Sequence, residues 1–199
     1  MSHEKLETNV GLMAIAIAAV IAIGGLAEIV PLMYQAETVK PLPGVKPYPA
    51  LELAGRDIYI REGCYNCHSQ MVRTLRFETQ RYGAYSDAGE SVYDRPFQWG
   101  SKRTGPDLAR LGGKYPDEWH YKHMDSPRSM VPRTNMPDYK WLRDYPLDPQ
   151  MIQRKMETLG FPFTAEEIKA LEGKNEMDAM VAYLQKLGSD IPWRNTTKT

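Results

Sequence analysis

Cysteine is nearly absent from this chain, which has only Cys64 and Cys67 among its 199 residues. Two cysteines leave none over for a disulfide framework or for a second metal site. An excess of charge of one sign is also missing, since 25 basic side chains balance 25 acidic ones. This balance argues against a nucleic-acid-binding protein, which would carry a basic patch or stripe.

Charge of either sign is missing from the run between Thr8 and Ala27, which consists mostly of Ala, Ile, Val, Leu and Met. A helix of about 20 residues can cross the hydrocarbon layer of a membrane. A cleaved signal peptide, the alternative, would have a basic head, whereas Lys5 here stands between two glutamates. A buried core helix would show a polar face, and none appears before Glu28. We therefore expect an uncleaved transmembrane anchor.

The two cysteines lie in the segment Cys64-Tyr65-Asn66-Cys67-His68. This C-x-x-C-H pattern is the attachment signature of a c-type haem. Each thiol can form a thioether with one haem vinyl group, and the histidine is held where its imidazole can bind the iron. A zinc ribbon would need four ligands, and a redox dithiol would need no adjacent histidine. The motif therefore predicts one covalent haem c bound by Cys64 and Cys67, with His68 as an axial ligand.

The other axial position of the iron decides the chemistry, because a filled position favours electron transfer and an open one favours gas binding or oxygen chemistry. Most of the 11 methionines are too close to the histidine in sequence or belong to predicted helices and their buried stripes. Met136 lies in a Pro-rich stretch, and Pro137 stiffens the backbone beside it. We predict Met136 as the ligand. Met130 is the next candidate, and His120 or His123 follow.

The chain is expected to have four parts. These are a transmembrane anchor over residues 8–33, a Pro-rich spacer over 34–49, a haem domain over 50–190 and a polar tail over 191–199. Pro31 is expected to end the membrane helix. Prolines at positions 41, 43, 47 and 49 predict a stiff, extended spacer.

The haem domain is predicted to be all-α with long loops. Apolar spacing and capping residues predict helices from about Ala50 to Gly63, Tyr115 to Asp125, Asp148 to Gly160, Thr164 to Glu172 and Glu176 to Leu187. Residues 81–100 fit no helical or strand period and are expected to form a long irregular loop. Gly55 inside the first of these helices indicates close crossing by another helix.

These elements together resemble a class I cytochrome c. The resemblance depends on a helix, the C-x-x-C-H motif, a Gly-Pro loop at Thr104–Leu108, a Met-Pro loop and a terminal helix. It implies an all-α fold, with an N-terminal transmembrane helix added to a class I cytochrome c-like domain. It also implies that the Pro106 carbonyl accepts a hydrogen bond from the His68 ring and that Arg103 pairs with a haem propionate. Gly55 and Tyr59 would meet the last helix around residues 183 and 184.

A closer resemblance is to the membrane-anchored mono-haem subunit (subunit II, the O subunit) of cbb3-type cytochrome c oxidase. The stretches that carry it are 3–5, 9–11, 25–31, 55–59, 61–70, 81–83, 97–103 and 117–120. Such subunits relay electrons from a di-haem cytochrome c subunit to the haem–copper catalytic subunit, where oxygen is reduced to water. The resemblance therefore implies an electron-transfer subunit that is not itself the site of oxygen chemistry. It also suggests a calcium ion at the subunit interface, for which Ser101 is the candidate ligand.

The same resemblance places the chain in a bacterial inner membrane. Because c-type haems are attached outside the cytoplasmic membrane in bacteria, we expect a single pass with a cytoplasmic N-terminus and a periplasmic haem domain. The alternatives are the small cytochrome c subunit of a nitric oxide reductase and a free-standing anchored cytochrome c. The stretch Trp99–Leu108 favours the oxidase.

Overall fold

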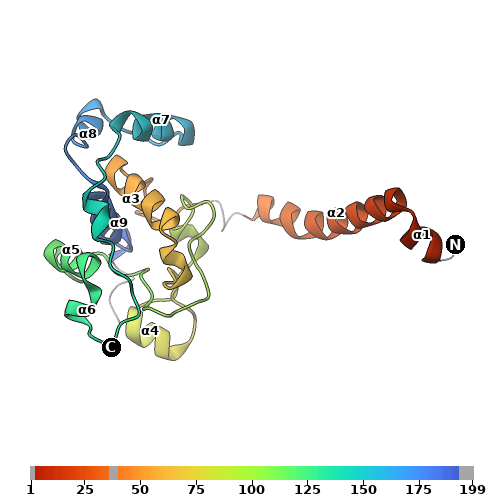
Figure 1. Cartoon of the computed structure of the whole chain (residues 1–199), viewed down its shortest axis with the longest axis horizontal. Coiled ribbons are helices and arrows are strands. Elements are labelled where there is room, and N and C mark those ends of the chain that lie inside the picture. Colours follow the sequence, from red (N-terminus) through yellow and green to blue (C-terminus); the bar gives the residue numbers. More distant parts are fainter. Residues whose placement is uncertain (1–2, 36–39, 193–199) are drawn as a thin grey trace. The chain divides into compact units, whose positions relative to one another are not determined.

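The computed structural model describes residues 3–35 and 40–192, and the helices among them are joined by long irregular loops. The chain divides into two compact units, Met1–Lys40 and Pro41–Thr199 (Figure 1). Outside the helices, the described residues contain one isolated β-bridge, between Pro146 and Asn175. The predicted all-α class, with a long apolar N-terminal helix and a helical domain, is therefore confirmed.

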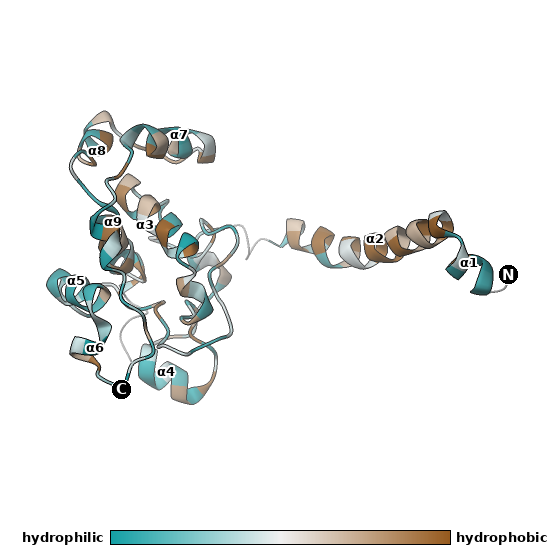
Figure 2. Cartoon of the chain, in the orientation of Figure 1, coloured by the Kyte–Doolittle hydropathy of each residue, from teal (hydrophilic) through white to brown (hydrophobic). Residues whose placement is uncertain are grey.

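The smaller unit consists of α1 (His3–Thr8) and α2 (Val10–Tyr34). Asn9 caps α2, because its side-chain oxygen accepts a hydrogen bond from the Leu12 amide at 3.0 Å. The 25 residues of α2 are almost all apolar (Figure 2) and contain one charged side chain, Glu28. Within the described residues, α2 is the one helix long and apolar enough to cross a membrane, and none of its side chains is buried in the chain itself.

The prediction that Pro31 ends the membrane helix is wrong, since α2 continues through Pro31 to Tyr34. Proline removes a single backbone donor, and the turn after it can still form hydrogen bonds. The amide of Gln35 donates to the carbonyl of Leu32 at 3.4 Å. Transmembrane helices tolerate proline in this way more often than soluble helices do.

The larger unit is organised by the crossing of α3 (Ala50–Arg61) and α9 (Glu176–Lys186). A Cβ atom on Gly55 would lie 1.9 Å from the carbonyl oxygen of Ala179, so only glycine allows this approach. The rings of Tyr59 and Tyr183 pack with centroids 5.4 Å apart. The close crossing expected at Gly55 is confirmed.

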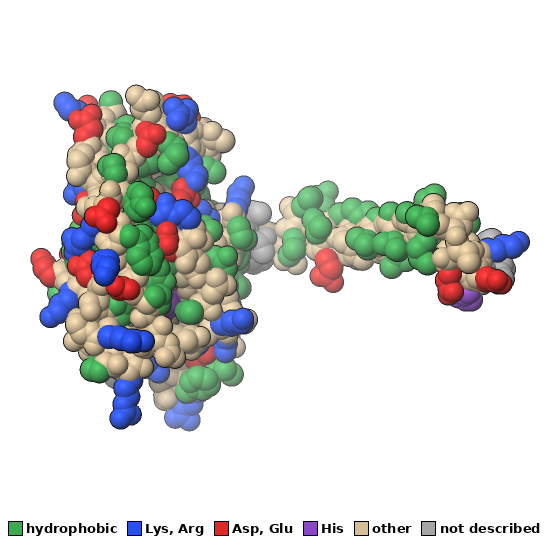
Figure 3. Space-filling model, in the orientation of Figure 1, with side chains coloured by type: hydrophobic (Ala, Val, Ile, Leu, Met, Phe, Trp, Pro, Cys, Tyr) green, Lys and Arg blue, Asp and Glu red, His purple; other side chains and the backbone are tan. Residues whose placement is uncertain are grey.

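The remaining helices pack around this pair. They are α4 (Arg76–Tyr82), α5 (Asp117–Asp125), α6 (Pro127–Met130), α7 (Pro149–Leu159) and α8 (Ala165–Lys169), with short 3₁₀ turns η2 (Cys64–Asn66), η3 (Ala88–Glu90) and η4 (Lys140–Arg143). The core between them includes Leu53, Met156, Met177 and Met180, each no more than 1% exposed. Charged side chains of both signs are spread over the face of this unit shown in Figure 3.

Helix ends agree with the predictions in most places. Asp148 caps α7 by accepting from the amides of Gln150 and Met151, and Gly160 ends that helix. The capping box predicted for α8 forms only in half. Thr164 accepts from the Glu167 amide at 3.1 Å, but the Glu167 carboxylate accepts from the Ala50 amide and caps α3 instead. The short helix α4 was not predicted, because its sequence has no apolar stripe.

Residues 41–49, predicted as the end of a stiff spacer, belong to the larger unit. The Leu42 amide donates to the Gly89 carbonyl at 3.0 Å, and the Lys46 amide donates to the Asp190 carboxylate at 3.1 Å. The parts of the predicted spacer and tail at 36–39 and 193–199 lie outside the described residues.

Candidate functional site

The C-x-x-C-H segment forms a tight turn directly after α3. The amides of Cys67 and His68 both donate to the Cys64 carbonyl, at 3.1 and 3.0 Å. Both thiols are free, with Cys64 half-buried and Cys67 exposed. Burial, with the charge of Glu62 as the next cause, raises the pKa of Cys64 to about 12. A reactive thiol is one of lowered pKa, and Cys64 does not have this property.

A zinc ribbon is not favoured either. Among the described residues, no group of three or more His, Cys, Asp or Glu side chains is arranged to hold a metal ion. A structural zinc site needs four ligands, almost always Cys or His.

The His68 ring has a fixed orientation. Its Nδ1 lies 2.8 Å from the Pro106 carbonyl oxygen, which is the partner that the resemblance implied. Because a carbonyl can only accept, Nδ1 carries the proton, and the lone pair of Nε2 is left available to a metal. Burial lowers the pKa of His68, and the contact with Pro106 partly offsets this effect. The ring is therefore held as a neutral imidazole with its ligating nitrogen defined.

Gly105 is the residue that lets the loop approach this ring. A Cβ atom at position 105 would lie 2.3 Å from Cε1 of His68 and 2.8 Å from each ring nitrogen. Any side chain would therefore displace either the imidazole or the loop. The backbone of Gly105 and Pro106 forms a cradle against one side of the histidine.

A second set of hydrogen bonds joins this cradle to residues 67–71, at the end of the motif and directly after it. The Gly105 amide donates to the Cys67 carbonyl at 2.9 Å, and the Leu108 amide donates to the Ser69 carbonyl at 2.8 Å. The buried carboxylate of Asp107 accepts from the Ser69 hydroxyl at 2.6 Å and from the Met71 amide at 2.8 Å. Sequence reasoning missed Asp107, although it is adjacent to Pro106.

Arg103 lies beside these hydrogen bonds, and other residues of the same chain bind its guanidinium. Its guanidinium forms an ion pair with Glu78, whose side chain is 1% exposed, and donates to the Ser69 hydroxyl at 2.7 Å and to the Met71 carbonyl at 2.6 Å. The expected pairing of Arg103 with a propionate stays a prediction. Ser101 is exposed, and its carbonyl accepts from Arg73 at 3.0 Å.

The candidate ligand Met136 lies on the segment between α6 and η4. Met136 and Tyr139 are half-buried and pack against the hydrophobic core, as does Cys64. The Tyr139 amide donates to the Met124 carbonyl at 2.8 Å, which attaches this segment to the end of α5. Burial, with the charges of the two cysteines as the next causes, raises the pKa of Tyr139 to about 12. Met136 as the ligand stays a prediction.

These observations together test whether the residues fit a haem. Two free thiols, an imidazole with a free Nε2 and a half-buried thioether form a donor set suited to a covalent haem iron. One buried ring nitrogen each of His120 and His123 also lacks a hydrogen-bond partner among the described residues. The residues present fit the group.

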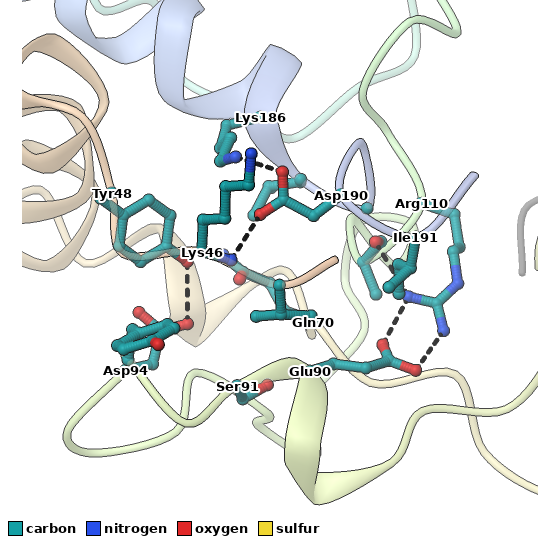
Figure 4. A pocket seen from close by; sticks show the side chains of 15 residues that line it. Lys46, Tyr48, Gln70, Glu90, Ser91, Asp94, Arg110, Lys186, Asp190 and Ile191 are labelled. Atoms are coloured by element: carbon teal, nitrogen blue, oxygen red, sulfur yellow. Dashed lines mark hydrogen bonds and ion pairs between the residues drawn. The ribbon is translucent and has the colours of Figure 1, made fainter. Parts of the chain in front are cut away.

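A separate small pocket, of about 60 Å³, lies where the 45–48 segment meets the end of α9 (Figure 4). Most of its charged groups are paired. Arg110 binds Glu90 at 2.7 Å, Lys186 pairs with Asp190 one helical turn away, and the Tyr48 hydroxyl donates to Asp94 at 3.1 Å. The Arg110–Glu90 and Tyr48–Asp94 pairs join segments 20 and 46 residues apart, which indicates a structural role.

The comparisons with known proteins give one positive finding. Residues 3–174 match a protein-family model described as "FixO: Cytochrome C oxidase, mono-heme subunit/FixO". The match includes α2, the C-x-x-C-H turn, the cradle at Pro106 and the segment with Met136. A search of curated proteins found no match.

Proposed function

The chain belongs to the FixO family, the mono-haem subunits of cbb3-type cytochrome c oxidase, and we propose that it relays electrons from a di-haem cytochrome c subunit to the haem–copper catalytic subunit. Family membership implies one haem and the other subunits of the oxidase as partners. The observation that carries the relay is the oriented His68, whose Nδ1 is fixed by Pro106 so that Nε2 can bind iron. Reduction of oxygen to water belongs to the catalytic subunit.

The haem would be held by this chain's own side chains. Cys64 and Cys67 would form the two thioethers, and His68 and Met136 would fill the axial positions. When bound, a haem with both axial positions filled supplies a one-electron carrier. The backbone of Gly105 and Pro106, held in place by Asp107, keeps the imidazole of His68 in one orientation. The thioether of Met136, a soft and neutral ligand, would favour ferrous iron and so would raise the reduction potential.

Two further roles follow from the resemblance. Arg103, whose guanidinium already pairs with Glu78, would also pair with a haem propionate. Ser101 would supply one oxygen to a calcium ion at the interface with the catalytic subunit. Calcium takes about 6–8 oxygen ligands, so most of that site would come from other groups.

The apolar helix α2 suggests a membrane anchor. We propose a single pass through a bacterial inner membrane, with the N-terminus in the cytoplasm and the haem domain in the periplasm. The spacer over 34–49 would connect the two parts, and 191–199 would form a tail. A cysteine scan with a membrane-impermeant thiol reagent would test this topology, because positions after residue 40 should react in intact spheroplasts and positions before Val10 should not.

The relay is tested on the assembled complex. A tag on this chain should recover, from mildly solubilised membranes, a complex that contains b-type haem and copper and consumes oxygen. His68→Gln should abolish electron flow from the di-haem subunit to oxygen. Recovery of a haem-c protein alone would favour a free-standing cytochrome, and nitric oxide reduction without oxygen consumption would favour a nitric oxide reductase.

A further inference from the structure

Basic and apolar side chains share the surface around α4. Segments 73–82 and 101–103 contain five basic residues and one acidic residue, in a chain whose two signs of charge balance overall. Phe77 is 65% exposed and Leu75 is 46% exposed, although both are large apolar residues. We call this surface the α4 patch, and its members are Arg73, Leu75, Arg76, Phe77, Arg81 and Lys102. Figure 3 shows basic and apolar side chains together at the lower edge of the larger unit, where Figure 1 places α4.

The two segments of the α4 patch are joined by buried contacts. Arg73 donates to the Ser101 carbonyl at 3.0 Å, and Arg103 forms an ion pair with Glu78. The Glu78 carboxylate also accepts from the Arg73 amide at 2.8 Å. Because Glu78 is 1% exposed, the one acidic residue of these segments is directed inwards. The outer surface is therefore positive, and its backbone is held in one shape.

The outward side chains of the patch have few partners within the chain. Arg76, Arg81 and Lys102 are exposed, and none of them forms an ion pair with a residue that the structure describes. Leu75 and Phe77 lie outside the hydrophobic core of the described residues. A cluster of exposed apolar side chains with charged neighbours is typical of an interaction site, because covering the apolar groups removes them from water.

The composition of the patch favours a protein over a lipid surface. Protein interfaces are enriched in Arg and Phe and depleted in Lys. Residues 73–82 contain three arginines and no lysine. An anionic lipid surface attracts Lys and Arg alike, so it gives no reason for this bias. The chain is a subunit of an oxidase, and the other subunits are the proteins at hand.

We propose that the α4 patch is the surface by which this chain docks on another subunit of the oxidase. Phe77 is the apolar anchor, and the partner surface presents a hydrophobic pocket with acidic side chains around it. The inference deepens the proposed function and rests on it, because an electron relay within a complex needs a fixed docking face. Since Glu78 already holds α4 in place, docking costs little ordering of the chain.

The test measures whether Phe77 is covered in the assembled oxidase. The proposed thioethers would consume both native cysteines, so Phe77→Cys would supply the one reactive thiol of the full-length chain. Its reaction with a hydrophilic maleimide is timed in detergent, once for the assembled oxidase and once for the chain matured without the other subunits. Labelling should be at least about tenfold slower in the oxidase, because a docked anchor is shielded from water.

Met151→Cys is the matched control, since Met151 is 57% exposed on α7, outside the patch. It should label at the same rate in both samples. Equal rates for Phe77→Cys in the two samples would overturn the proposal. Slow labelling of Phe77→Cys in phosphatidylglycerol vesicles that hold this chain alone would assign the patch to lipid, and this too would overturn it.

A charge reversal tests the chemistry of the partner. Arg76→Glu should lower the b-type haem recovered per haem c through a tag on this chain by about tenfold, since like charges would face each other at the interface. Arg154→Glu, an exposed arginine of α7, should leave this ratio unchanged. Equal ratios in the two variants would overturn the acidic partner surface.

Failure of the proposed function would look different. If the wild-type chain, which lacks an added cysteine, reacted with the maleimide, Cys64 and Cys67 would be free and the haem attachment would be wrong. An unlabelled wild-type chain together with equal rates for Phe77→Cys would refute the docking face alone.

Discussion

Substitution of Gly105 by alanine tests the cradle around the axial histidine. The added methyl carbon would lie 2.3 Å from Cε1 of His68, whereas ordinary contact begins near 3.4 Å. The ring or the loop must therefore move by the difference, about 1.1 Å. A movement of this size breaks or lengthens the 2.8 Å hydrogen bond between His68 and Pro106.

The expected cost has two contributions. Overpacking costs about 1–3 kcal/mol, and loss of the hydrogen bond costs about 1 kcal/mol. Gly105→Ala should therefore lower the free energy of unfolding by about 2–4 kcal/mol. It should also shift the reduction potential and the iron–imidazole stretching frequency, because the bond between Nδ1 and the carbonyl tunes the basicity of the ligand.

The assay compares Gly105→Ala with Gly113→Ala. A Cβ at Gly113 meets nothing within 4 Å, but φ there is +72°, so alanine is strained without touching the site. The control should lose about 1–2 kcal/mol of stability with an unchanged potential and stretching frequency. The reasoning would be refuted if Gly105→Ala behaved like the control, or if it kept wild-type stability and potential.

Three other predictions follow from the structure. Gly55→Ala should destabilise the larger unit by about 3 kcal/mol in denaturant titrations, because its methyl group would overlap the Ala179 carbonyl 1.9 Å away; an unchanged midpoint would contradict the close crossing. Arg103 and Arg73 lower the pKa of the buried Glu78 below its ordinary value, although burial alone would raise it. The stability that the Glu78 carboxylate contributes is thus present above a pH of about 4.3 and is lost as the pH falls through its folded-state pKa. Glu78→Gln should therefore lower the free energy of unfolding by about 3 kcal/mol at pH 7 and by less in acid. An equal loss at both pH values would argue against the pairing. His68→Ala should block haem incorporation or assembly, and a normal haem-stained band with an unaltered spectrum would count against its role.

The local signals in the sequence predicted much of the fold. The cap at Asp148, the stop at Gly160 and the buried stripe of α9 each depend on residues within one or two turns, so they could be identified without tertiary information. The close crossing at Gly55 could be predicted because a glycine inside a helix is unfavourable unless something approaches it.

Long-range polar pairs could not be predicted in the same way. Arg56 and Asp94 form a buried ion pair at 2.5 Å across 38 residues, and Glu78 meets Arg103 across a loop. Each partner is an ordinary charged residue in sequence, and only the packed fold brings it to the other. The role of Asp107 was missed for the same reason, since its carboxylate reaches back to Ser69 and Met71.

The error at Pro31 has a physical cause. A proline costs a soluble helix about 3 kcal/mol, but one lost donor near the end of a long apolar helix leaves the following turn intact. α2 therefore extends to Tyr34.

The central claim is that the two thiols and His68 hold one haem permanently. Intact-mass measurement of the full chain, matured in a host competent for c-type haem attachment and unfolded in acid, tests it most directly. We expect the polypeptide mass plus one haem, and loss of this addition in Cys64→Ala combined with Cys67→Ala. A bare polypeptide mass for the wild-type chain would contradict it.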